Sequence, residues 1–89
     1  MRPAALVTGS ARGIGRTLLL TLGELGHDVA VHYRSSREAA EAVAGEARAL
    51  GVEAVTLQAD VTDVDDALRL VDDAAAAFGR LDVVVNNVG

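Results

Sequence analysis

The sequence has no cysteine, few aromatic residues and no long apolar run. Without cysteine there are no disulfides and no thiolate metal sites, and the redox compartment is only weakly indicated. No stretch approaches the ~20 apolar residues that a transmembrane helix needs. Aromatic residues make up 2% of the 89 positions, whereas 51% are hydrophobic, so valine, leucine and alanine must build the core. The length predicts one small domain or part of a larger one.

Positive charge is also scarce. The sequence has eight arginines and no lysine but thirteen acidic residues, which gives a net charge of −5. An acidic chain without a basic cluster is not expected to bind nucleic acid or an anionic membrane. The apolar run at residues 4–7 is too short for a signal peptide, so we expect a cytoplasmic protein. His27 and His32 stand without a cluster of metal-ligating residues, so we expect surface or strand-packing roles and no metal.

Strand-like and helix-like segments alternate along the chain. Apolar runs predict buried strands, and apolar residues at helical spacing predict helices. A glycine follows each expected helix, at positions 26, 51 and 79, as a C-terminal cap. The pattern predicts strands at residues 4–7, 28–33, 53–59 and 81–85. It predicts helices at residues 14–25, from a cap at residue 35 or 36 to residue 50, and from a cap at residue 62 or 63 to residue 78.

The alternation predicts an α/β fold of the form βαβαβαβ with a parallel sheet. Right-handed crossovers and a ligand site at the first turn predict strand order 3-2-1-4, a Rossmann-type sheet. The fourth strand is a continuous β-branched run, as in a strand buried on both faces, yet this order leaves it at an open edge. The expected apolar faces of the three helices are, in order, Ile14, Leu18, Leu22 and Leu25; Ala39, Val43, Ala47 and Leu50; and Val64, Ala67, Leu68, Val71, Ala74, Ala75 and Phe78.

The stretch from Thr8 to Gly15, Thr-Gly-Ser-Ala-Arg-Gly-Ile-Gly, joins the first strand to the first helix. Glycines permit positive φ and a close approach of the backbone to a ligand, and the helix N-terminus attracts a pyrophosphate. The spacing is not G-x-G-x-x-G, because Leu18 stands where the third glycine would be. A plain tight turn in another α/β protein is the alternative interpretation.

Two further motifs accompany this loop: Asp60-Val61 after the third strand, and Asn86-Asn87-Val88-Gly89 after the fourth. Together the three motifs resemble those of the short-chain dehydrogenase/reductase family, in which the last one reads Asn-Asn-Ala-Gly. Within that family the loop and residues 32–36 look like those of 3-oxoacyl carrier-protein reductases. The resemblance covers all 89 residues. It predicts a single dinucleotide-binding half-domain over residues 1–89, the first half of a doubly wound domain.

The resemblance also implies roles for individual residues. Gly9, Gly13 and Gly15, together with Ser10, would shape the pyrophosphate loop, and Ile14 would lie against the cofactor. Asp60 would accept a hydrogen bond from the adenine amino group, with Val61 beside the ring. Asn86 and Gly89 would border the ribose, and Asn87 would help to hold the sheet together. The alternatives are a turn or cap for Asp60 and ordinary loop chemistry for the asparagines.

The region after the second strand distinguishes between the two nicotinamide cofactors. NAD-binding proteins usually hold the ribose 2′-hydroxyl with a carboxylate about 20 residues after the glycine loop, whereas no acid occurs here between Asp28 and Glu38. Arg34 stands there instead and could bind a 2′-phosphate, with Arg12 on the other side and Ser35 and Ser36 as hydroxyl donors. This favours NADP. The alternative is that both arginines are solvated surface charges.

The family's catalytic Ser, Tyr and Lys cannot be mapped onto this chain, because it has no lysine and its one tyrosine, Tyr33, ends the second strand. We therefore expect the NADP-binding N-terminal part of an oxidoreductase that acts on a small carbonyl or alcohol substrate. The catalytic residues would lie beyond Gly89 or on a partner chain, and a homo-oligomer or a complementing chain is expected. The alternatives are a stand-alone nucleotide-binding module and a truncated fragment without catalytic function.

Overall fold

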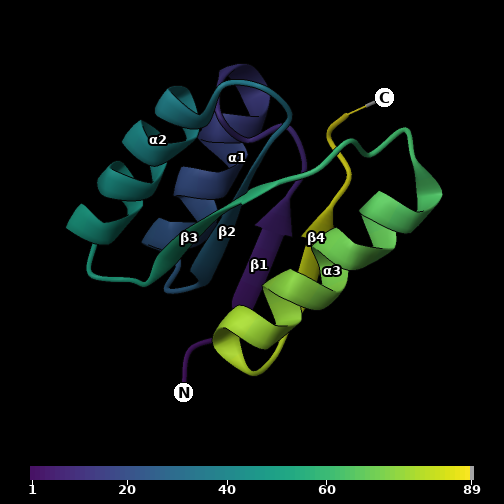
Figure 1. Cartoon of the computed structure of the whole chain (residues 1–89). Helices are drawn as coiled ribbons and strands as arrows, with labels where there is room; N and C mark the ends of the chain where they lie inside the picture. Colours follow the sequence, from purple (N-terminus) through teal and green to yellow (C-terminus); the bar gives the residue numbers. More distant parts are fainter. Residues whose placement is uncertain (89) are drawn as a thin grey trace.

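The alternating pattern folds as expected in a computed structural model that describes residues 1–88. This part of the chain forms four strands and three helices (Figure 1). They are β1 (Ala4–Val7), α1 (Gly13–Glu24), β2 (Asp28–Tyr33), α2 (Arg37–Ala49), β3 (Ala54–Gln58), α3 (Val64–Phe78) and β4 (Val83–Val85). The first two strands have the expected bounds, whereas β3 and β4 are shorter than expected.

The strands form one parallel sheet in the order β3-β2-β1-β4, which confirms the predicted topology. Val7 at the end of β1 pairs with Val31 of β2 on one side and with Val85 of β4 on the other. The carboxyl ends of all four strands therefore lie on the same side of the sheet, and the loops before α1, α2 and α3 emerge from that side (Figure 1). Ligands of open parallel sheets bind at the carboxyl ends of the strands.

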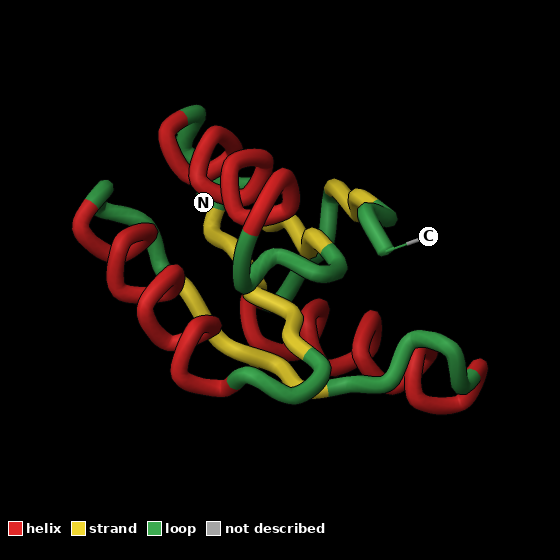
Figure 2. The backbone as a smooth tube through the Cα atoms, turned by 90° about the horizontal axis from the view of Figure 1, so that it is seen from above, coloured by secondary structure: helices red, strands yellow, loops and turns green. Residues whose placement is uncertain are grey.

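Helices lie on both faces of the sheet (Figure 2). One apolar core, with Val7, Leu19 and Val43, lies between the sheet and the helices α1 and α2, and a smaller one, with Leu6 and Leu70, lies under α3. Two helices thus cover one face of the sheet and one helix covers the other. β4 stands at the lateral edge of the sheet, as this strand order predicted, and Val84 is 52% exposed, so within residues 1–88 the strand lacks the burial on both faces that its composition is typical of.

The predicted apolar face of α1 is wrong. Gly15, Leu19 and Gly23 are the buried residues of this helix, whereas Ile14 and Leu25 are 74% and 71% exposed. The glycines face the interior because they bring the helix backbone close to its neighbours: a Cβ added to Gly15 would lie 2.2 Å from the carbonyl oxygen of Gly9. Close backbone packing, rather than the largest side chains, selects the buried face.

The predicted apolar face of α3 combines residues from a buried side and an exposed side of the helix. Leu70 and Ala74 are buried against the sheet, although Leu70 was not part of the prediction. Val64 and Leu68 are exposed, and Val71 partly so, because the uncovered edge of the sheet leaves this side of α3 without a neighbour in residues 1–88. In α2 the buried residues are Ala40, Val43, Ala44 and Ala47, so Ala39 and Leu50 of the expected face lie at its margin.

Candidate cofactor-binding site

The glycine loop leaves β1 and enters α1 through two residues with left-handed backbone. Gly9 and Gly13 both have a φ of 64°, a conformation that side chains rarely adopt. The N-cap residue of α1, Arg12, makes no side-chain capping hydrogen bond, so the first backbone N–H groups of the helix stay available to an anion. A Cβ on Gly13 would meet no atom within 4 Å, so the space in front of the loop is open.

The start of the glycine loop is hydrogen-bonded to the segment that follows β4. The hydroxyl oxygen of Thr8 accepts hydrogen bonds from the backbone N–H groups of Asn87, at 2.9 Å, and Val88, at 3.2 Å. Asn87 Nδ2 donates to the carbonyl oxygen of Gly9 at 3.4 Å. The first and last motifs of the chain thus form one structural unit, and Asn86 lies beside Thr8, with 3.3 Å between Oδ1 and the hydroxyl oxygen.

Both candidate 2′-phosphate ligands line one pocket of about 280 Å³ beside the glycine loop. Arg12 comes from the loop after β1 and Arg34 from the end of β2, and the parallel pairing of these strands brings the two residues to the same pocket. The lining residues are Gly9, Ala11, Arg12, His32, Tyr33, Arg34, Ser35 and Ser36. Ser36 is the N-cap residue of α2, but its side chain makes no capping hydrogen bond.

Asp60 follows β3 and lies next to Arg34, although it does not line this pocket. Its Oδ1 accepts hydrogen bonds from the backbone N–H of Thr62, at 3.0 Å, and from the Thr62 hydroxyl, at 2.6 Å. Arg34 Nη2 lies 3.6 Å from Asp60 Oδ2. The two Thr62 hydrogen bonds, helped by the Arg34 charge, lower the pKa of Asp60. Asp60 therefore has the local turn role that the sequence left open, and its second oxygen faces Arg34.

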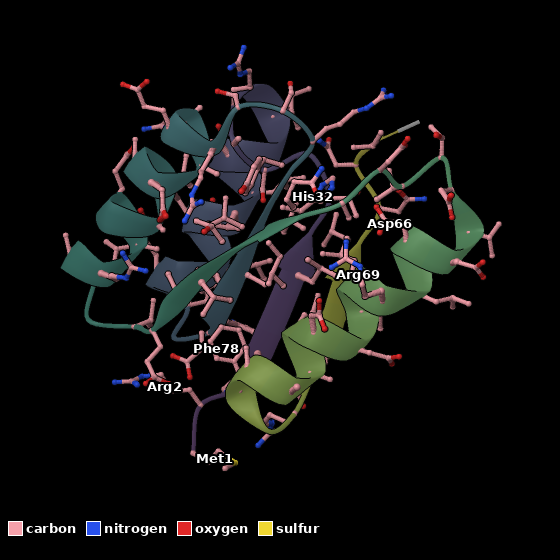
Figure 3. All side chains as sticks on the ribbon, in the orientation of Figure 1. Met1, Arg2, His32, Asp66, Arg69 and Phe78 are labelled. Atoms are coloured by element: carbon pink, nitrogen blue, oxygen red, sulfur yellow. The ribbon has the colours of Figure 1, made fainter. Side chains whose placement is uncertain are left out.

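The backbone at Asp60 is fixed by α3, since its N–H donates to Asp66 Oδ2 at 2.6 Å. Asp66 in turn accepts from Arg69, which also donates to the carbonyl oxygen of Gln58 (Figure 3). These bonds lower the pKa of Asp66 and raise that of Arg69. The acidic run at the start of α3 thus anchors the end of β3, and Asp63 caps the helix at the N–H of Asp66.

The remaining candidates lie in a second groove or within the glycine loop itself. Val61 and Asn86 line a second groove of about 280 Å³ between α3 and β4, together with Thr8 and Val88. Ile14 is exposed at the start of α1, and Ser10 is buried, with its hydroxyl accepting from the N–H of His32 at 3.0 Å. Gly89 lies outside the described residues.

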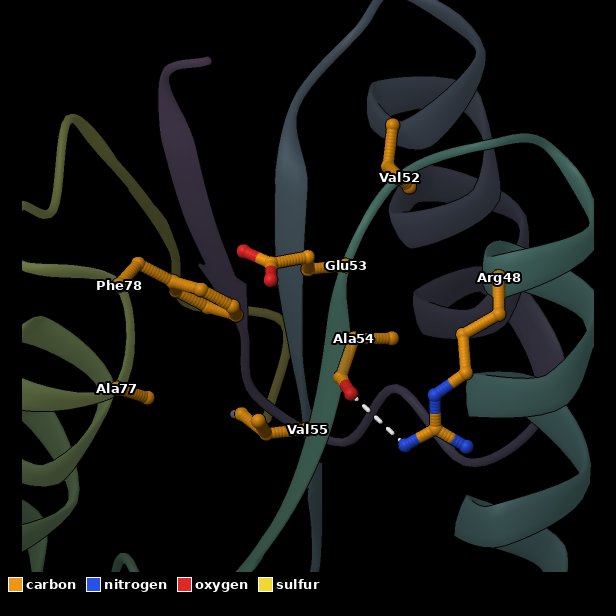
Figure 4. A pocket seen from close by; sticks show the side chains of 7 residues that line it. All are labelled: Arg48, Val52, Glu53, Ala54, Val55, Ala77 and Phe78. Carbon is orange, nitrogen blue, oxygen red and sulfur yellow. Dashed lines mark hydrogen bonds between the residues drawn. The ribbon is translucent and has the colours of Figure 1, made fainter. Parts of the chain in front are cut away.

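Two further features do not belong to this site. A pocket of about 310 Å³ lies at the opposite end of β3, where Arg48 donates to the carbonyl oxygen of Ala54 at 2.8 Å (Figure 4). It contains none of the candidate residues. In the part of the chain that the structure describes, no helix is long and apolar enough to span a membrane. Over the same residues, no three His, Cys, Asp or Glu side chains group as a metal site would require.

His32 is the site residue that sequence reasoning missed. The sequence left open a surface or a strand-packing role, and the structure excludes the first, because the side chain is 2% exposed. Its ring Nδ1 accepts the N–H of Gly9 at 2.8 Å, and its Nε2 lies 2.9 Å from the carbonyl oxygen of Ala59 (Figure 3). The position of His32 in a buried strand was a signal that the side chain would be buried. Its hydrogen-bond partners could not be predicted, because they are 23 and 27 residues away in the sequence.

A parallel sheet of order 3-2-1-4, with a glycine loop between its central strand and the following helix, defines a Rossmann-type dinucleotide-binding fold. The short chain dehydrogenase family model matches residues 3–89. The chain therefore belongs to the short chain dehydrogenase family.

Individual relatives agree with this assignment. The chain is 48% identical over all 89 residues to a 3-oxoacyl-[acyl-carrier-protein] reductase of Staphylococcus aureus, and it covers 36% of that protein. Among solved structures, a short chain dehydrogenase from Burkholderia cenocepacia in complex with NADP superposes with a TM-score of 0.94 at 46% identity, over 98% of this chain and 36% of the other. The acetoin dehydrogenase of Enterobacter cloacae gives 0.94 at 37% identity, over 100% and 35%. The chain thus spans about a third of the length of its relatives.

Proposed function

We propose that this chain is the NADP(H)-binding N-terminal part of a short-chain oxidoreductase that transfers hydride between NADP(H) and a carbonyl or alcohol substrate. The observation that carries the proposal is the pocket beside the glycine loop that Arg12 and Arg34 both line. A ribose 2′-phosphate is a dianionic group, and planar guanidinium groups bind its oxygens in pairs. The NADP-bound relative at 46% identity supports the same assignment.

The residues present fit the rest of the cofactor as well. The uncapped N-terminus of α1 and the open space in front of Gly13 suit the pyrophosphate. The adenine would lie beside Asp60 and Val61, and Asn86 would border a ribose. NADPH supplies the hydride that reduces a carbonyl carbon, and a proton must reach the carbonyl oxygen. This chain's own residues bind and orient the cofactor for that step.

The proton donor lies outside this sequence in our proposal. The chain has no lysine, and Tyr33, its one tyrosine, packs against the core beneath α2. We propose a small carbonyl or alcohol as the substrate, and the 3-oxoacyl group in the name of the Staphylococcus aureus relative is one example of such a carbonyl compound. We further propose a cytoplasmic protein that acts as a homo-oligomer or with a complementing chain.

A second candidate function follows from the absence of a lysine in this sequence. A chain with an arginine-lined pocket beside its glycine loop and no catalytic lysine would serve as a nucleotide-binding module without chemistry of its own. A non-catalytic fragment is the remaining case. NADPH binding distinguishes the module from the fragment, and turnover with a model carbonyl substrate distinguishes the reductase from the module.

Exchange of Arg34 tests the cofactor assignment. Arg34→Asp removes a charge-assisted contact of about 1.5–3 kcal/mol, so the dissociation constant for NADPH should rise about 10- to 100-fold. The constant for NADH should stay level or fall. Arg37→Asp is the matched control, since it makes the same change in net charge at an exposed residue that does not line the pocket. An unchanged ratio of the two constants in Arg34→Asp would exclude NADP specificity through this residue.

Substitution in the loop tests the phosphate position. Gly13→Val should abolish NADPH binding, because its side chain would occupy the open space in front of the loop. Gly79→Val is the control for backbone strain: Gly79 also has positive φ, 74°, and open space around its Cβ, but it lies at the end of α3. Calorimetry that finds the same affinity for both variants would show that the pyrophosphate does not pass Gly13.

A further inference from the structure

One residue, His32, holds the first turn of the glycine loop from both sides. Its ring Nδ1 accepts the N–H of Gly9 at 2.8 Å, and its backbone carbonyl oxygen accepts the N–H of Ser10 at 3.1 Å. Its own N–H donates to the Ser10 hydroxyl oxygen at 3.0 Å. The two peptide planes that flank Gly9, where φ is 64°, are therefore both oriented by the same residue of β2.

The far end of the ring is anchored on the third strand. Nε2 lies 2.9 Å from the carbonyl oxygen of Ala59, the residue before Asp60. A carbonyl can only accept and the Gly9 N–H can only donate, so the ring is neutral with its proton on Nε2. Because both ring nitrogens are engaged, the imidazole cannot turn without losing a buried hydrogen bond. It therefore links the ends of β1, β2 and β3.

The orientation of Gly9 matters for the site because its carbonyl oxygen is the atom against which α1 packs. That oxygen belongs to the Gly9–Ser10 peptide, which the backbone carbonyl of His32 holds, whereas the imidazole holds the preceding Thr8–Gly9 peptide and acts on the oxygen through the Cα of Gly9, where the two peptides meet. A Cβ on Gly15 would lie 2.2 Å from the oxygen, so a small rotation of either peptide would displace the N-terminus of the helix. The Gly9 N–H is also occupied by the imidazole, so a phosphate must be bound by the N–H groups at the start of α1 instead.

We propose that His32 is a positioning residue for the pyrophosphate loop, and that it acts through the acceptor Nδ1 of its Nε2–H tautomer on the N–H of Gly9. This inference rests on the proposed NADP site. It differs from a packing role, because a packing role depends on the shape of the ring, whereas positioning depends on one particular acceptor atom.

Two amide substitutions separate the ring nitrogens. In His32→Asn the carboxamide carbon is Cγ, so Oδ1 takes the place of Nδ1 and keeps the acceptor for Gly9, while the bond to Ala59 is lost. In His32→Gln the carboxamide is one carbon further along and reaches the place of Nε2, so it keeps Ala59 and loses the acceptor for Gly9. Each variant loses one buried hydrogen bond, so both should lower the melting temperature by similar amounts.

The affinities for NADPH should differ. We expect His32→Gln to raise the dissociation constant about tenfold or more, the equivalent of one lost hydrogen bond, and the conservative His32→Asn to retain most of the affinity. Equal losses in the two variants, in proportion to their stability, would show that His32 only packs the core. No loss in either variant would equally overturn the inference.

Measurements without cofactor keep this test apart from the proposed function. Nitrogen NMR of the ring should show a protonated Nε2 and an unprotonated Nδ1, and the Gly9 amide should exchange slowly with solvent in the native chain and in His32→Asn, but fast in His32→Gln. If this pattern holds while NADPH fails to bind the native chain, the proposed function is wrong and the positioning of the loop stands. A proton on Nδ1, or fast exchange of Gly9 in all three proteins, overturns the inference itself.

Discussion

Gly15→Ala should destabilise the protein although it replaces a helical glycine with the best helix former. The new Cβ would lie 2.2 Å from the carbonyl oxygen and 2.9 Å from the carbonyl carbon of Gly9, so α1 or the loop must move by roughly 1 Å or more. Overpacking of this kind costs about 1–3 kcal/mol, and backbone atoms place it at the upper end. The helix propensity of alanine returns about 1 kcal/mol. We expect a net loss of about 2 kcal/mol.

Gly45→Ala is the matched control within α2. Gly45 also lies in the interior of a helix, but its added Cβ would meet nothing within 4 Å. The same substitution should therefore stabilise the protein by up to about 1 kcal/mol. For a chain of this size, each kcal/mol shifts the melting temperature by about 4–8 °C. Thermal unfolding followed by circular dichroism should thus show a drop of about 8–16 °C for Gly15→Ala and a rise for Gly45→Ala.

Cofactor affinity should follow the same division. Gly15→Ala displaces the carbonyl of Gly9 and with it the pyrophosphate loop, so NADPH should bind more weakly, whereas Gly45→Ala leaves the loop untouched. A Gly15→Ala protein that melts at or above the native temperature would refute the close approach of α1 to the loop. It would also remove the explanation for the buried face of that helix.

Four further substitutions test the packing and the charges of the fold. Leu70→Ala, in the core under α3, should lower the free energy of unfolding by about 2–5 kcal/mol, whereas Leu68→Ala, on the exposed side of the same helix, should change it little; urea titration measures both. Asp63→Ala removes the N-cap of α3 and should cost about 1 kcal/mol in the same assay. Arg80, together with a backbone N–H of β1, lowers the pKa of Asp82 from 3.8 to about 2, so this carboxylate stabilises the native state above pH 4 and loses that effect as the pH falls towards 2. Asp82→Asn should therefore be less stable than the native chain at neutral pH and equally stable near pH 2.

The order of the elements could be predicted because its signals are local. Gly26, Gly51 and Gly79 each follow a helix in left-handed conformation, and the apolar runs between them are too short for anything but strands. Parallel strands joined by right-handed crossovers leave few possible orders, so the prediction of 3-2-1-4 needed no long-range information.

The faces of the helices could not be predicted in the same way. Leucine or isoleucine occupies positions 14, 18, 19, 20, 22 and 25 of the first helix region, so several apolar stripes overlap and periodicity does not choose between them. The choice depends on Gly15, where backbone meets backbone. In α3, Leu70 rather than Leu68 is buried, because the sheet covers only one side of that helix.

The sequence by itself determined the family, the topology and the residue types of the candidate site, since these depend on motifs and on short-range pattern. Only the tertiary structure decided which of those residues meet. The parallel pairing of β1 with β2 brings Arg12 and Arg34 to one pocket, and the adjacency of β2 and β3 places the His32 ring between Gly9 and Ala59. Such contacts join residues more than twenty positions apart, and a hydrogen bond depends on distances that no sequence spacing encodes.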